Sequence, residues 1–181
     1  MKRNIRTIAL ALVFFLCGAF TTGLIINRKS TMNLLDNKKV AQVAIIVKDI
    51  EKSAAAYAEL FNTDVPGISV SQEPAGKPTL YEGEHTQARA KLAFFNLENV
   101  QIELIQPVDK PSTWNDFLEK HGEGIHHIAF WVDGVKKHVN MFKDAGMPEV
   151  QSGGWDGGEY SYIDAGDKLG IVIELLENYN K

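Results

Sequence analysis

The chain has 181 residues, of which 45% are hydrophobic and 23% are charged, as is ordinary for a globular protein. Five of its 19 basic residues lie within the first thirty positions, so the remainder carries 14 basic and 23 acidic side chains, a net charge of −9. An acidic domain repels nucleic acid and anionic lipid, and we expect neither as a partner of that domain. The only cysteine, Cys17, lies in the same N-terminal stretch, which excludes a disulfide framework or a thiolate metal site in the rest of the chain.

The N-terminal stretch has a composition of its own. Three basic residues precede residues 8–26, an apolar run without a single charged side chain. Such a pattern is typical of a cleaved signal peptide or of an uncleaved membrane anchor, and the sequence leaves both open. We therefore expect an apolar helix within residues 1–30 that engages the membrane or the export machinery, followed by a linker over 31–39. The protein is expected to be exported, as a periplasmic or extracellular protein or one anchored to the membrane by residues 8–26.

The first half of the remaining chain has the pattern of a strand, a helix and then about three strands. Alternating or continuous apolar runs mark the strands, Asp49 is a candidate helix N-cap, and a stretch rich in proline, glycine and polar residues marks a loop. The predicted elements are a strand over 40–47, a helix from Asp49, a short strand over 68–71, a long loop over 73–87, and a hairpin of 89–97 with 99–106.

The second half repeats this order after a helix over 111–121 that bridges the halves. It is predicted to contain a strand over 125–132, a helix over 133–145, a strand pair of 149–155 with 159–164, and a last strand over 170–177. The repetition extends to residues, because the strand beginning at Gln42 superimposes on the one beginning at His127. Two copies of one supersecondary unit that must each bury a sheet face predict an α+β domain over 40–177 with a shared, curved sheet.

Four polar side chains interrupt the apolar strands. Side chains alternate between the two faces of a strand, so Gln42, Glu103, His127 and Glu174 can share one face while their neighbours pack under helices. Any one of them alone would read as a solvent-facing residue, but a carboxylate within an apolar strand is costly unless it is paired or binds a metal. One imidazole nitrogen and three oxygens suit a divalent ion with positions left for water or substrate. By the same alternation, His126 faces the helices as a hydrogen-bonded core histidine.

Other side chains are weaker candidates for substrate contacts. Arg89 and Lys91 lie beside the long loop and could meet a carboxylate or phosphate, or simply be solvated. Trp155 and Tyr160 flank a glycine-containing hairpin and could line the site, although packing is the simpler interpretation. His138 is expected on a helix surface.

The segment FLEKHGEGIHHIAFWVD at 117–133, together with IELIQP and GIVIEL, resembles the vicinal oxygen chelate superfamily over residues 40–177. These sequence segments are most similar to those of methylmalonyl-CoA epimerase-like members. The set of Gln42, Glu103, His127 and Glu174 is instead similar to the metal-ligand set of one form of glyoxalase I. The resemblance implies two βαβββ modules, 40–107 and 124–177, that form a cup-shaped mixed sheet with helices on the outside. It also implies that the four polar residues bind one metal ion (Zn, Ni, Co or Mn) and that two chains can pair as a homodimer.

The function implied by this resemblance is proton abstraction next to a carbonyl, with a divalent metal ion stabilising the resulting enolate. Glu174 is then the base and Glu103 its partner, in an epimerase or a glyoxalase-type lyase or isomerase whose small substrate carries adjacent oxygens. The alternatives are an exported protein of the same fold that binds or sequesters a small molecule, and a dioxygenase, which the glutamine at position 42 disfavours.

Overall fold

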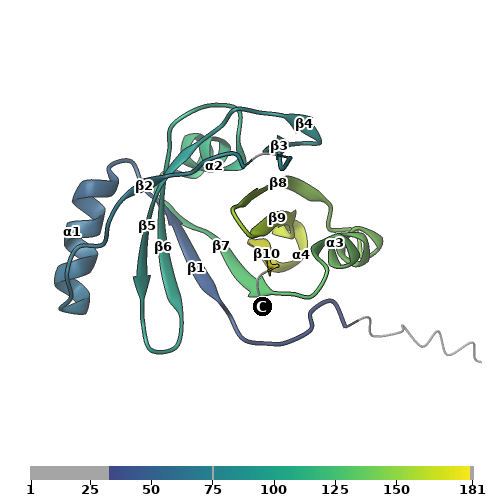
Figure 1. Ribbon diagram of the computed structural model, residues 1–181, viewed down its shortest axis with the longest axis horizontal. Coiled ribbons are helices and arrows are strands. Elements are labelled where there is room, and N and C mark those ends of the chain that lie inside the picture. The colour runs from purple at the N-terminus through teal and green to yellow at the C-terminus, as the bar shows by residue number, and fades with distance from the viewer. Residues whose placement is uncertain (1–32, 75, 180–181) are drawn as a thin grey trace, which may run out of the picture. The chain divides into compact units, whose positions relative to one another are not determined.

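The computed structural model describes residues 33–74 and 76–179, and Figure 1 shows how their helices and strands are arranged. The apolar run over 8–26, predicted to be a signal peptide or anchor, lies outside the described residues. Among the residues that are described, no helix is long and apolar enough to cross a membrane.

The strands of the described chain form one ten-stranded mixed sheet. The first module contributes β1 (Gln42–Ile46), α1 (Ile50–Phe61), β2 (Ser69–Val70), β5 (Ala90–Asn96) and β6 (Gln101–Pro107). The second module contributes β7 (Gly124–Trp131), α3 (Val135–Asp144), β8 (Glu149–Trp155), β9 (Gly158–Asp164) and β10 (Val172–Asn178). The remaining elements are β3 (Leu80–Tyr81), β4 (Glu84–His85), the bridging helix α2 (Thr113–His121) and the short α4 (Gly166–Leu169).

The two modules are joined at the middle of the sheet. The strand order is β2-β5-β6-β1-β7-β10-β9-β8-β3-β4, with β1 antiparallel to β7. Within each module the first and last strands are parallel neighbours, β1 with β6 and β7 with β10. The two first strands and the two last strands are therefore four consecutive neighbours, β6-β1-β7-β10, in a sheet that curls (Figure 1). This confirms the predicted mixed, curved sheet shared by two repeated modules.

Helices α1 and α3 cover the outer face of the sheet, each over its own module (Figure 1). Asp49 caps α1 as predicted, because its side chain accepts a hydrogen bond from the Lys52 backbone N–H at 2.9 Å. The apolar side chains that alternate with the four polar residues pack beneath these helices, for example Leu104 under α1 and Leu175 under α3. Burial of this outer face leaves the polar set on the concave side.

Helix α2 packs against the concave side, which places it inside the curl rather than outside with α1 and α3. It begins at Thr113, two residues after the predicted start, because Ser112 is its N-cap and accepts from the Asn115 backbone N–H at 3.2 Å. Trp114 of α2 is buried in a cluster that includes Ala44, Ile105 and Tyr162 from the concave face. The helix thereby closes one end of the curl with apolar side chains.

The predicted loop over 73–87 contains a small hairpin, β3–β4, that the sequence did not indicate. Strand β3 pairs with β8, at the opposite edge of the sheet from β2. The turn residues Glu82 and Gly83 both have positive φ, 51° and 82°, as a tight two-residue hairpin requires. Two-residue strands are too short to show periodicity, and glutamate is an unusual residue at positive φ, so neither usual hairpin signal was present.

The predicted linker over 31–39 is docked from residue 33 onward. Leu34 and Leu35 pack against the core beneath α3. The His138 ring contacts the Leu34 carbonyl oxygen through Nδ1 at 2.9 Å and the Asp36 carboxylate through Nε2 at 3.0 Å. The expectation that His138 lies on a helix surface is therefore wrong, since only 1% of this residue is exposed. The segment that contains Leu34 and Asp36 covers the His138 side chain.

Candidate metal centre

Three buried side chains converge on the concave face from three different strands. Glu103 lies on β6, His127 on β7 and Glu174 on β10, and each is less than one tenth exposed. Ala44 of β1 lies between Glu103 and His127 in register, and Ala129 of β7 lies beside Glu174. Because alanine side chains are short, they leave the carboxylates and the imidazole room to lean toward one another. The small residues in these strands thus help to shape the polar centre.

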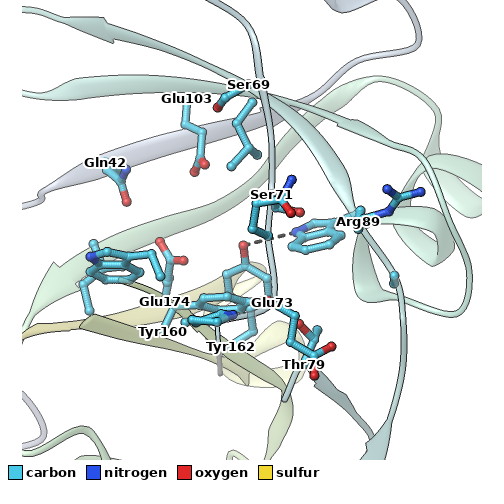
Figure 2. A pocket seen from close by; sticks show the side chains of 18 of the residues that line it. Gln42, Ser69, Ser71, Glu73, Thr79, Arg89, Glu103, Tyr160, Tyr162 and Glu174 are labelled. Atoms are coloured by element: carbon cyan, nitrogen blue, oxygen red, sulfur yellow. Dashed lines mark hydrogen bonds between the residues drawn. The ribbon is translucent and has the colours of Figure 1, made fainter. Parts of the chain in front are cut away.

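The distances within this triad suit a metal ion. His127 Nε2 lies 3.1 Å from Glu174 Oε2 and 3.6 Å from Glu103 Oε2, and one potential ligand atom from each residue lies within 4.8 Å of the others. Figure 2 shows the two carboxylates pointing toward each other from opposite walls of a pocket. His127 Nε2 and Glu174 Oε2 are buried and have no hydrogen-bond partner among the described residues, although they are close together. Such unsatisfied atoms are rare in a protein interior, and a shared cation would satisfy both.

Gln42, the fourth predicted ligand, lines the same pocket (Figure 2). Its amide Nε2 donates to Gln101 Oε1 at 2.5 Å, and Gln101 Nε2 in turn donates to Asn96 Oδ1 at 2.6 Å. This chain of amides assigns the N–H groups of Gln42 to Gln101. Its carbonyl oxygen, the only atom of this side chain suited to a cation, is left for the pocket.

The electrostatics of the metal-free centre are dominated by burial. Burial raises the pKa of Glu103 above its ordinary value, and the nearby charge of Glu174 raises it further, while His127 opposes the change. For His127 burial acts against the charged ring, but Glu174 and Glu103 together outweigh it and raise its pKa to about 9. Without a metal ion, the centre therefore holds a proton on the nitrogen that a metal would need.

The centre lies in a pocket of about 1320 Å³ on the concave side. Three tryptophans, Trp114, Trp131 and Trp155, contribute to its lining, and residues of the 71–79 segment form part of its wall. Trp114 Nε1 donates to the Tyr162 hydroxyl at 3.1 Å, drawn as a dashed line in Figure 2. The pocket thus combines a polar centre with aromatic walls, as small-molecule sites commonly do.

The weaker candidates divide between the pocket and the outer surface. Arg89, Trp155 and Tyr160 line the pocket, and Arg89 pairs with Asp109 at 2.7 Å. Lys91 lies on the opposite face of β5 and pairs with Glu51 at the start of α1, at 2.7 Å. The expectation that Lys91 contacts substrate is therefore not supported by its position. Arg89 immediately precedes β5 and lies at the pocket, whereas Lys91 lies within the strand.

His126 also departs from the simple alternation. The pairing of β1 with β7 shifts by one residue, because Ala44 opposes His127 whereas Ile45 opposes Ile125. His126 is the extra residue of this β-bulge, and a bulge turns its side chain away from the regular alternation. It is buried and hydrogen-bonded as expected, but beside His127 and against α2 rather than toward the outer helices. Burial and the neighbouring His127 lower the pKa of His126 well below its ordinary value.

Several pocket residues were not identified from the sequence. Tyr162 is buried with its ring 4.8 Å from that of His127, and burial raises the pKa of its hydroxyl. It lies two positions after Tyr160 on β9, so alternation along the strand, extended from Tyr160, could have found it. Alternation along 125–132 predicts Trp131 on the face of His127, although its contribution to the pocket lining was not predicted. Glu73 and Thr79 come from the loop, where no periodicity was available.

Comparison with known proteins adds to this geometry. Residues 41–163 match a family model described as the Glyoxalase/Bleomycin resistance protein/Dioxygenase superfamily. A curated relative, the ethylmalonyl-CoA/methylmalonyl-CoA epimerase of Cereibacter sphaeroides, is 30% identical over 142 residues, which cover 76% of this chain and 96% of the relative. The mitochondrial methylmalonyl-CoA epimerase of Dictyostelium discoideum is 33% identical over 146 residues, covering 77% and 78% of the two chains.

The solved structures show a similar fold. The crystal structure of methylmalonyl-CoA epimerase from Mycobacterium tuberculosis matches with a TM-score of 0.53 at 22% sequence identity. The match covers 77% of this chain and 87% of that one.

Proposed function

The chain belongs to the Glyoxalase/Bleomycin resistance protein/Dioxygenase superfamily, and from this premise we propose that it is a metal-dependent epimerase or isomerase acting at a carbon next to a carbonyl. The observation that carries the proposal is the buried triad. Two carboxylates and an imidazole converge there with two unsatisfied atoms, His127 Nε2 and Glu174 Oε2. A neutral imidazole, two carboxylates and a divalent cation have no net charge together, which removes much of the cost of burying them.

The residues that would hold the ion are Glu103, His127 and Glu174, with the carbonyl oxygen of Gln42 as a fourth ligand. Nitrogen and oxygen donors without a thiolate suit zinc, nickel, cobalt or manganese. A divalent ion held by these residues would draw electron density from a substrate carbonyl oxygen and would make the adjacent C–H bond more acidic.

The protein's own contribution is to move the proton. Glu103 and Glu174 extend from β6 and β10, which lie on either side of the central β1–β7 pair. They point toward each other from two sides of the pocket (Figure 2), so a substrate carbon held next to the metal position would expose one face to each carboxylate. We assign Glu174 as the base that removes the proton and Glu103 as the group that returns or stabilises it. Removal from one face and return to the other inverts the carbon, which is epimerisation.

The substrate class follows from the relatives and the pocket. Both reported relatives are named as epimerases of acyl-CoA thioesters, so a 2-substituted malonyl thioester is the first candidate. The pocket, at about 1320 Å³, exceeds the usual range of roughly 300–1,000 Å³ for small-molecule sites and leaves space for an extended thioester.

The test is exchange of the substrate proton with solvent. The full chain, loaded with Co²⁺, is incubated with methylmalonyl-CoA in D₂O, and deuterium at the substituted carbon is followed by NMR. We expect exchange with the parent protein and a loss of about 100-fold or more in Glu174→Gln and in Glu103→Gln. Lys91→Ala is the control and keeps the parent rate, because Lys91 lies on the outer face and pairs with Glu51.

Two results would count against the proposal. No exchange by metal-loaded protein that still binds the thioester would favour a binding or sequestering role. Equal exchange in the parent and in both glutamine variants would place the proton transfer elsewhere.

A further inference from the structure

Tyr162 lies beside the residue that is assigned as the base. It is on β9, directly opposite Glu174 of β10 in register, and paired residues of neighbouring strands carry their side chains on the same face, about 5 Å apart. Figure 2 shows the Tyr162 hydroxyl and the carboxylates of Glu103 and Glu174 directed into the same pocket. A substrate that is placed for proton removal by Glu174 therefore also lies next to the Tyr162 hydroxyl.

The hydrogen bond between Trp114 and Tyr162 has only one possible direction. The indole nitrogen of tryptophan can donate but cannot accept, so the Tyr162 oxygen accepts from the Trp114 Nε1–H group at 3.1 Å. A phenol oxygen that accepts a hydrogen bond still has its own hydrogen to donate. Trp114 is the only hydrogen-bond partner of this hydroxyl among the described residues. The hydroxyl hydrogen of Tyr162 is therefore left for a molecule that enters the pocket.

The ring of Tyr162 is held by its neighbours before any substrate binds. Its centroid lies 4.8 Å from the ring of His127, 5.0 Å from that of Tyr160 and 6.2 Å from that of Trp114. Only 3% of Tyr162 is exposed. A buried donor that is fixed in advance stabilises a developing negative charge better than water does, because it does not have to reorient during the reaction.

We propose that Tyr162 is a further catalytic residue, whose hydroxyl donates a hydrogen bond to the substrate oxygen that becomes negatively charged when the proton is removed. In this step the C–H bond breaks, the proton goes to Glu174, and the electron pair moves toward the carbonyl oxygen. Tyr162 keeps its own hydrogen throughout. The inference rests on the proposed function and deepens it, because the β9 wall then takes part in the reaction beside the residues of the metal centre.

A purely structural role for Tyr162 is the simpler alternative. Its hydroxyl accepts from Trp114 and thereby ties α2 to β9. If this were the whole role, Tyr162→Phe would disturb the pocket wall and would weaken the binding of charged and neutral ligands alike. A hydrogen bond to a developing charge instead predicts a selective loss, which is confined to the transition state and to ligands that resemble it.

The first measurement separates kcat from KM in the exchange of the methylmalonyl-CoA proton by the Co²⁺-loaded full chain. We expect Tyr162→Phe to lower kcat about 100-fold, to change KM little, and to keep its bound metal. Tyr57→Phe is the matched control, because it loses the same hydroxyl from a ring that packs against Phe61 and Phe95 on the outer face. It should keep both constants.

Two outcomes of this measurement are distinct. A Tyr162→Phe protein with the parent kcat, whether or not its KM rose, would overturn this inference and leave the proposed function intact. A metal-loaded parent that exchanged no proton would end both proposals.

The second measurement uses binding rather than turnover. The probe 2-nitronate-propionyl-CoA carries a negative charge on oxygen of the kind that forms in the reaction, and propionyl-CoA is its neutral counterpart. By titration calorimetry of metal-loaded protein, we expect Tyr162→Phe to bind the nitronate about 10- to 100-fold more weakly than the parent does, because a hydrogen bond to a charged group is lost. Its affinity for propionyl-CoA should be that of the parent. An equal loss for both ligands would overturn the inference.

A third measurement decides the matter even if Tyr162→Phe does not fold. In proton NMR of the Zn²⁺-loaded parent, the Tyr162 hydroxyl hydrogen is identified by its nuclear Overhauser contact with the Trp114 indole N–H group. We expect its signal to shift downfield when the nitronate binds and to move little with propionyl-CoA. A hydroxyl hydrogen whose signal did not respond to the bound nitronate would contradict the assignment of Tyr162.

Discussion

The charge of His127 is the property of the metal centre that an experiment can reach most readily. In the metal-free protein its pKa is raised to about 9 by Glu174 and Glu103 against the effect of burial. The unfolded value is about 6.5, so the charged ring contributes stability below pH 6.5 that is lost as the pH rises through 9. At neutral pH a metal ion must displace this proton, because the same Nε2 lone pair binds both.

We therefore predict that metal affinity rises with pH. Between pH 7 and pH 8.5 the Co²⁺ association constant should increase about tenfold per pH unit, and binding should release about one proton. Calorimetry at pH 7.5 in buffers of different ionisation enthalpy measures the protons released. An association constant that did not change over this range would show that His127 is already neutral in the metal-free protein.

A second prediction concerns Glu103 and the cost of its burial. Its pKa is raised mainly by burial, so the ionised side chain lowers stability at neutral pH, and this cost disappears below pH 4.5, where the folded and unfolded forms are both protonated. In metal-free protein Glu103→Gln should raise the free energy of unfolding at pH 7.5 by about 1 kcal/mol. Urea denaturation at pH 7.5 and pH 4 measures the difference, which should shrink at the lower pH. If Glu103→Gln were less stable than the parent at pH 7.5, the attraction between ionised Glu103 and His127 would outweigh the cost of burying the Glu103 charge.

At the scale of elements, the strands that carry the site were predictable because their patterns are regular. Period-two alternation placed Glu103 and Glu174 on the concave face, with Leu104 and Leu175 under the helices, as the structure has them. The repeat also indicated which strands are equivalent. The bulge at His126 was not predictable, because a one-residue shift in pairing depends on the partner strand and leaves no periodic signal in its own.

The β3–β4 hairpin is the element that the sequence predicted least well, and only the structure revealed it. The chain leaves β2 at one edge of the sheet, contributes residues 71–74 and Thr79 to the pocket wall, and pairs with β8 near the other edge. The Tyr81 hydroxyl donates to Asp116 of α2 at 2.6 Å, and this bond raises the pKa of Tyr81 to about 12. The hairpin is thereby attached to α2.

Removing this attachment should loosen the hairpin without unfolding the protein. In Tyr81→Phe we expect the backbone amides of residues 80–85 to exchange with solvent about fivefold faster, since one such hydrogen bond is worth about 1 kcal/mol. Hydrogen-exchange mass spectrometry measures this, with peptides from α1 as the internal control. Unchanged exchange at the hairpin would show that its pairing with β8 is sufficient to hold it.

At the scale of the whole molecule, the site depends on both modules. Gln42 and Glu103 come from the first module, His127 and Glu174 from the second, and the β1–β7 pairing brings them together. Neither module contains the complete set, so separation of β1 from β7 removes the metal site. The resemblance and the repeat predicted that the two modules share one site. The interior position of α2 and the docking of residues 33–37 were not predicted, because they depend on long-range packing.

A ligand that binds only the assembled site stabilises the whole fold. At a free Co²⁺ concentration about 100 times the dissociation constant, the free energy of unfolding should increase by about 2.7 kcal/mol. Urea denaturation with and without Co²⁺ measures this gain, which should be absent in His127→Ala. An equal gain in that variant would indicate that the ion binds elsewhere on the chain.

The most direct test of the account is the metal content of the protein. The full chain is loaded with Co²⁺, freed of excess metal by gel filtration and subjected to elemental analysis, beside His127→Ala, Glu174→Gln and the control Lys91→Ala. We predict about one ion per chain in the parent and in Lys91→Ala, and almost none in the two site variants. A metal-free parent, or site variants that retain a full equivalent of metal, would contradict the assignment of Glu103, His127 and Glu174 as a metal centre.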